Sequence, residues 1–355
     1  MNRIKEAFLE VLIVFVVGGL IGASLAVVSN LFVSSVQWFS QKRESADFLT
    51  ASFGNQTISF SSLLFLWAAA AAVVVIKKSL GIAKWAGPAD SMYSAHQLNV
   101  PFNIKQGLAS TLAAFASVSG GASVGQYGPI VHFGATVGII TSKLQLRKRL
   151  GFNRLPREIY LACGVAAAIS AGFNAPIAGI IFAHEAILRH FSVRAIAPIT
   201  VSSIAASSVG GYLFPHTATF KIDAAAPALA EVVPFLVILS PIFAITAIAF
   251  MVSIRYSTKL ATSLSVNPIL LPFIGATACG LVGLFVPQAL GLGVSNINDM
   301  IAGEYIVPML ISVLIAKIFM TSACIGFGVF GGVFSPAFFI GVAAGALTTK
   351  LLVAV

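Results

Sequence analysis

The chain has 355 residues, of which 58% are hydrophobic and only 9% are charged. Soluble domains carry about 25% charged residues, so this composition excludes an ordinary soluble fold and predicts a multi-pass integral membrane protein. The net charge of +10 comes from basic clusters at the ends of apolar runs, which indicates cytoplasmic loops and not nucleic-acid contacts.

The predicted helices follow the apolar runs in chain order. The first run, from about Phe8 to Phe39, exceeds one bilayer crossing and predicts a long, tilted helix. Arg3 and Lys5 precede it, which predicts a cytoplasmic N-terminus in the cell (plasma or inner) membrane. A polar stretch, a helix over 61–75 and a short helix near Gly87-Pro88 are expected next. Further apolar segments lie at 106–118, 129–142, 159–183, 194–213, 232–254, 269–287, 305–322 and 336–353.

Two stretches, 111–138 and 322–346, are too rich in Gly and Pro for plain spanning helices. Both contain the pattern G-x-x-x-P-x-x-x-x-G-x-x-x-G, which starts at Gly125 and again at Gly332, an offset of 207 residues. Proline suits the first turn of a helix, where free N–H groups attract anions. Broken half-helices at matching places in two halves are typical of transporter sites. Kinked helices that pack through GxxxG are the structural alternative.

At these residues the sequence resembles the CLC family of chloride channels and chloride/proton antiporters. The family motif G-K/R-E-G-P corresponds to GQYGP at 125–129, and G-x-F-x-P corresponds to GVFSP at 332–336. The segment AGFNAPIAGIIF at 171–182 is similar to the family's approach to its inner-side helix.

The resemblance implies an all-α polytopic membrane fold, an inverted repeat of tilted and broken helices. It places the first half-repeat at 1–215 and the second at 216–355, the latter apparently shortened at its C-terminus, with no cytosolic regulatory domain. It also implies a homodimer with one anion pathway in each subunit.

The resemblance also implies that backbone N–H groups hold the anion. Residue by residue, it assigns Val333 and Phe334 to a central site, and Gln126, Tyr127 and Gly128 to an outer site. The anion-binding candidates also include Ala86, which stands where the family has a serine that contacts the central anion.

Tyr127 replaces the family's gating glutamate. Its side chain cannot exchange protons near neutral pH, because the reference pKa of tyrosine is about 10. As a gate it could still plug the pathway or donate its O–H to an anion.

The family's inner proton-relay glutamate corresponds to Ala186, and the glutamate before it to Glu185. A shift of the alignment by one residue would instead make Glu185 the relay, and His184 is a second candidate for a proton-linked role. Lys317 lies within an apolar run, where it either snorkels to the interface or raises the positive potential of the pathway.

These features predict transport of chloride or a similar small anion across the lipid bilayer, by passive channel conduction because both glutamates are replaced. The alternatives are a coupled anion/proton antiporter or fluoride exporter, and a non-conducting CLC-like membrane subunit. No enzyme activity, cofactor or metal site is expected, because the three cysteines are far apart and no nucleophile–base set appears. The sequence does not decide which anion is preferred or whether Tyr127 blocks or conducts.

Overall fold

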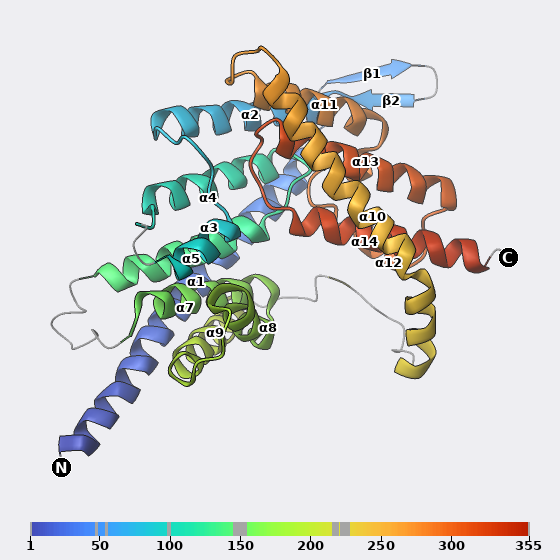
Figure 1. Cartoon of the computed structure of the whole chain (residues 1–355). Helices are drawn as coiled ribbons and strands as arrows, with labels where there is room; N and C mark the ends of the chain where they lie inside the picture. The colour runs from blue at the N-terminus through green and yellow to red at the C-terminus, as the bar shows by residue number, and fades with distance from the viewer. Residues whose placement is uncertain are drawn as a thin grey trace. The chain divides into compact units, whose positions relative to one another are not determined.

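The computed structural model describes residues 2–46, 49–53, 56–97, 101–144, 155–214, 220 and 228–353. These residues are almost entirely helical, with one short hairpin (Figure 1). They divide into two compact units, each assembled from separate stretches of the chain. The first unit comprises Met1–Val36, Ile76–Leu112 and Gln126–His216, and the second comprises Gln37–Val75, Ala113–Gly125 and Thr217–Val355. Because these units alternate along the chain, they do not coincide with the half-repeats 1–215 and 216–355, and that division stays a prediction.

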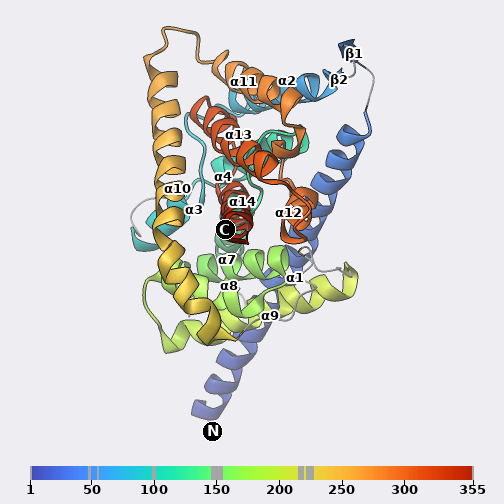
Figure 2. The same cartoon turned by 90° about the vertical axis from the view of Figure 1, so that its right-hand side faces the viewer.

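Six of the described helices are long and apolar enough to cross a membrane. They are α1 (Asn2–Glu44), α2 (Ser61–Ser79), α9 (Val193–Leu213), α10 (Leu229–Ser263), α13 (Val307–Gly326) and α14 (Phe334–Val353). The chain is therefore a multi-pass membrane protein, as its composition predicts. Helix α10 contains Pro234 and Pro241, and its N-terminal turns bend away from the remainder (Figure 2).

The first unit is built around α7 (Arg157–Phe173), which packs against α5 (Tyr127–Lys143) and α9. Most of α7 is buried, and its small residues let neighbouring backbones approach closely. A Cβ atom on Gly164 would overlap the carbonyl of Gly134, so the α5–α7 contact depends on glycine at both positions.

The apolar segment 159–183 does not form one helix, because the chain breaks it into two. Helix α7 ends at Phe173 with Asn174 in the left-handed region at φ 51°, and Pro176 starts α8 (Pro176–Phe182). Asparagine tolerates this conformation, and proline then begins the next helix. Helix α8 continues directly into a π-helical turn, η2 (Ala183–Leu188).

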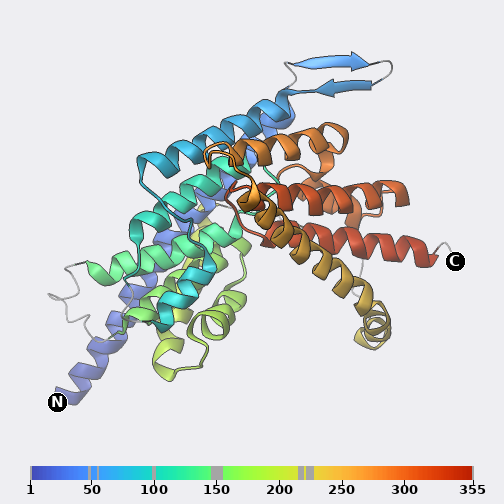
Figure 3. The ribbon, with the colours of Figure 1, turned by 45° about the horizontal axis from the view of Figure 1, so that its top comes forward.

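The second unit contains α10, α11 (Leu271–Phe285), the short turn η3 (Pro287–Ala289), α12 (Val294–Ile301), α13 and α14. It also contains a hairpin of β1 (Thr50–Phe53) and β2 (Gln56–Ser59), in which Thr50 lies opposite Ser59; the hairpin leads into α2 (Figure 3). The hairpin and α12 were not predicted. The hairpin lies in a polar stretch, whereas α12 is amphipathic, with Ile297 and Met300 buried, but has only eight residues.

Candidate functional site

The two glycine-rich stretches form the same turn. Helix α4 (Ile104–Ser119) is followed by Gly121 at φ +90°, and α13 is followed by Gly328 at φ +87°. The bonds also match: the Ala122 N–H donates to Ser117 O at 3.0 Å, and the Val329 N–H donates to Cys324 O at 2.9 Å. This is the Schellman ending of a helix, which requires glycine where φ is positive.

The first glycines of the two motifs pair with each other inside the second unit. The Gly125 N–H donates to Gly332 O at 2.6 Å, and the Gly332 N–H donates to Gly125 O at 2.6 Å. A Cβ atom on Gly125 would lie 3.1 Å from both Gly332 O and Ser335 N. The structure thus brings together the two residues from which the repeated pattern begins.

Each motif then starts a helix at the same offset, α5 at Tyr127 and α14 at Phe334. In the second unit, Val333 and Phe334 are about half exposed, at 49% and 51%. The first N–H groups of α14 have no intrahelical partners, as at any helix start, and they carry partial positive charge. Ser335 is buried there, and its Oγ has no hydrogen-bond partner among the described residues.

The first unit holds the other helix start. Gln126 is the residue before α5 and is buried, and Gly128 lies in the first turn of α5. The Tyr127 ring stacks on Phe173 of α7 at 3.9 Å between centroids, and its hydroxyl shares a hydrogen bond with the Gln126 side chain. Tyr127 is therefore held by contacts within its own unit. Its role as a gate stays a prediction.

Ala86 precedes α3 (Pro88–His96) and is buried, but its N–H is already bonded. It donates to Ser110 Oγ at 2.9 Å, while the Gly87 N–H donates to Asp90 Oδ2 at 2.8 Å. An anion at this helix start would have to compete with both acceptors. The role of Ala86 in anion binding stays a prediction.

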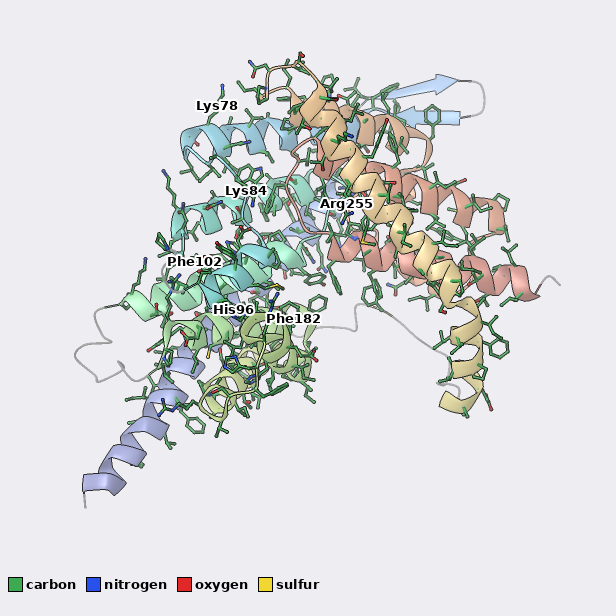
Figure 4. The ribbon with its side chains drawn as sticks, in the orientation of Figure 1. Lys78, Lys84, His96, Phe102, Phe182 and Arg255 are labelled. Atoms are coloured by element: carbon green, nitrogen blue, oxygen red, sulfur yellow. The ribbon has the colours of Figure 1, made fainter. Side chains whose placement is uncertain are left out.

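A cavity of about 210 Å³ lies beside this helix start, lined by Ala86, Asp90 and His132 among others. The Nδ1 of His132 lies 2.6 Å from Ser91 Oγ, and its ring stacks on Phe102, which Figure 4 labels beside α5. The His132–Ser91 contact ties α5 to α3 inside the first unit.

The proton-linked candidates lie in the π-helical turn η2. His184 is fully buried, stacks on Phe191 at 4.9 Å, and has no hydrogen-bond partner for Nε2 among the described residues. Glu185 is exposed and Ala186 is half-buried. A π-helical turn changes which face each side chain occupies, and the sequence gives no sign of it. The buried candidate is thus the histidine and not the carboxylate.

Two cations of the second unit, Lys317 and Arg43, are buried among the described residues. Lys317 is fully buried and does not snorkel, because its Nζ donates to Ala289 O at 3.0 Å and to Gly291 O at 2.7 Å. Arg43, which the sequence placed among loop cations, is also buried and lies against Gly121.

Comparison with known proteins identifies the family. The model of the voltage gated chloride channel family matches residues 68–355, well over half of the chain. The chain belongs to the voltage-gated chloride channel (CLC) family. This confirms the resemblance read from the two glycine motifs.

Two curated relatives illustrate the range of CLC proteins to which the chain is similar. The voltage-gated ClC-type chloride channel ClcB of Escherichia coli is 24% identical over 270 residues, covering 75% of this chain and 62% of that protein. The H(+)/Cl(-) exchange transporter ClcA of Vibrio cholerae is 30% identical over 235 residues, covering 63% of this chain and 48% of that protein. The chain therefore spans 48% to 62% of the length of these relatives.

A solved CLC structure shows the fold. A CLC-type fluoride/proton antiporter superposes with a TM-score of 0.76 at 20% identity, covering 95% of this chain and 81% of that one. The predicted fold class, a helical polytopic CLC fold, is confirmed.

Proposed function

We propose that this CLC chain transports chloride or a similar small anion across the cell membrane by passive conduction. The observation that carries the proposal concerns the buried side chains of the described residues. They include the cations Arg43 and Lys317, but no aspartate or glutamate. Such an interior favours an anion and offers no carboxylate to carry a proton in the opposite direction.

The anion would be held by backbone N–H groups at the starts of α5 and α14. In this proposal Val333 and Phe334 form the central site, and Gln126, Tyr127 and Gly128 form the outer one. Helix starts bind anions through their free N–H groups and the helix dipole, so no charged side chain has to touch the ion. The reciprocal Gly125–Gly332 pair supports this arrangement by anchoring the residue just before each helix-start segment.

Tyr127 and Ala186 support the passive mechanism over a coupled one. Tyr127 stands in place of the gating glutamate, and its stacking on Phe173 restricts rotation of the ring. Ala186, in place of the relay glutamate, has no ionisable group. We also propose that the protein is a homodimer, as its family membership implies. The N-terminus is proposed to lie in the cytoplasm.

Coupled anion/proton exchange is the second candidate, and one observation favours it. His184 is buried with an unpartnered Nε2, next to Glu185, which is exposed and could receive protons from water. The similar fluoride/proton antiporter and the H(+)/Cl(-) exchange transporter are named for such coupling.

Proteoliposomes loaded with chloride separate the two mechanisms. Anion efflux is started with a potassium ionophore, and proton uptake is recorded in parallel, with a second set of vesicles loaded with fluoride. We expect efflux without proton uptake. Stoichiometric proton uptake would contradict passive conduction, and complete absence of flux would favour a non-conducting subunit.

Two variants sharpen this test. Tyr127→Glu restores an ionisable group at the gate, so we expect its flux to become pH-dependent, whereas Tyr127→Phe keeps the ring and should remain pH-independent. If the wild-type protein moves protons, His184→Ala should abolish the proton flux while leaving anion flux measurable. Proton flux that survives this change would exclude His184 as the carrier.

A further inference from the structure

Lys317 is a fully buried cation whose surroundings are unusual. Its Nζ donates to the carbonyl oxygens of Ala289 and Gly291, and lies 4.7 Å from the centre of the Phe339 ring. These contacts provide carbonyl acceptors for two of its three N–H groups. They do not neutralise its charge, because carbonyl groups and aromatic rings carry no net charge.

No carboxylate among the described residues pairs with this ammonium group. Within the described ranges the ion pairs are Arg43–Glu44 and Lys84–Asp90. The other polar groups that act on Lys317 are the thiols of Cys279 and Cys324 and the like charge of Arg43. An unpaired cation inside a protein is costly, so a buried lysine either loses its proton or has a negative partner nearby.

The matching position of the first repeat carries a neutral side chain. Lys317 follows Ser110 by 207 residues, the offset of the repeat. Ser110 Oγ accepts from the Ala86 N–H just before α3, and Lys317 donates to Gly291 O just before α12. A neutral side chain thus anchors the approach to the short helix in the first repeat. Anchoring this approach therefore does not by itself require a charge, although the bond in the second repeat runs the other way, from the lysine to a carbonyl.

The charge lies close to the elements that carry the proposed central anion site. Phe339, which lies against the ammonium, belongs to α14, the helix that starts at Phe334. The Gly291 N–H donates to Gly121 O at 2.9 Å, which links the loop that Lys317 contacts to the turn before Gly125. The charge of a buried cation is screened by water and salt much less than that of an exposed one.

We propose that the transported anion is the missing counterion of Lys317. Lys317 is a positioning residue in this sense: it does not touch the ion but raises the affinity of the helix-start site through its charge. This inference rests on the proposed function, since it names the residue that sets the anion affinity of the same site.

Three variants separate the charge from the hydrogen bonds. Lys317→Arg keeps both, Lys317→Gln keeps a donor to the carbonyls without charge, and Lys317→Met removes both. Chloride binding to purified protein is measured by calorimetry, with flux from proteoliposomes alongside. We expect Gln and Met to weaken chloride affinity about tenfold, and Arg to stay within about threefold of wild type.

Lys350 supplies the matched control. It lies in the same unit and also donates to a backbone carbonyl, Gly303 O at 2.9 Å, but its side chain is exposed. Lys350→Gln removes the same charge where water and salt screen it, so chloride affinity should not change. Equal losses in Lys317→Gln and Lys350→Gln would overturn the proposal, as would a Lys317→Gln protein that binds chloride like wild type.

A second route tests the charge without changing Lys317. Cys279→Asp places a fixed carboxylate beside the ammonium and should weaken chloride binding about tenfold, while Cys279→Asn should not. Tighter chloride binding by Cys279→Ser would identify a Cys279 thiolate as the counterion and overturn the proposal.

If wild-type protein shows neither binding nor flux, the proposed function itself fails. If wild type binds and transports but all these variants match it, only this inference fails.

Discussion

The two copies of the glycine motif differ most in their last two glycines. In α5, a Cβ atom on Gly134 would lie 2.6 Å from Ala168 Cβ, and one on Gly138 would overlap the carbonyl of Tyr160. In α14, a Cβ atom on Gly341 or Gly345 would meet nothing within 4 Å. The same spacing therefore produces close helix packing in one copy and an open face in the other. A glycine pattern shows where a neighbour can approach, but the neighbour decides whether it does.

The largest effect on stability is expected from adding a methyl group to either packed glycine of α5. Gly134→Ala or Gly138→Ala should lower stability by about 3 kcal/mol, because the new methyl group would overlap backbone atoms of α7, which cannot move as a flexible side chain can. The matched changes Gly341→Ala and Gly345→Ala should be neutral or stabilise the protein by up to about 1 kcal/mol, because alanine favours helix. Thermal unfolding in detergent measures all four.

The stability losses of the four variants test whether the glycine faces of α5 and α14 differ in this way. Equal losses in α5 and α14 would mean that the face of α14 is covered in the working protein. Small losses in both would mean that α5 and α7 can separate by a few tenths of an ångström without cost.

The parts of the fold that could be predicted are those with a local physical signal. Apolar runs gave the long helices, and the repeated Gly and Pro gave the starts of α5 and α14, since proline and left-handed glycine restrict the backbone directly. The break at Asn174 was missed although Pro176 is visible in the sequence, because asparagine adopts the left-handed conformation only in some contexts.

The backbone arrangement of the candidate site could be predicted from the sequence, but the burial or exposure of its charged side chains could not. Gly125 and Gly332 were matched by spacing alone, and they do pair. The burial of Arg43 was not predictable, because a basic residue at the end of an apolar run is normally exposed at the membrane surface. The π-helical turn that leaves Glu185 exposed likewise depends on packing that no spacing reveals.

A smaller effect distinguishes the two turns. Gly121 and Gly328 have nearly the same φ, so alanine at either should cost about 1 kcal/mol in backbone strain. A Cβ atom on Gly121 would also lie 3.0 Å from Arg43 Cδ and overlap its guanidinium, whereas one on Gly328 would meet only Pro272 at 3.9 Å. We therefore expect Gly121→Ala to cost about 2 kcal/mol and Gly328→Ala about half of that. Equal losses would show that Arg43 moves aside freely.

The smallest effect concerns the neutral anchor of the first repeat. Ser110→Ala leaves the buried N–H of Ala86 without an acceptor and should cost about 1 kcal/mol in thermal unfolding. Ser117→Ala is the control in the same helix: it is equally buried, but its Oγ donates to Ala113 O, which remains a helix acceptor. The control should lose only a few tenths of a kcal/mol. Matching losses would mean that Ser110 does not anchor the approach to α3. In that case Ser110 and Lys317 would correspond in position only. The first repeat would then no longer show that a neutral side chain can anchor the approach to the short helix.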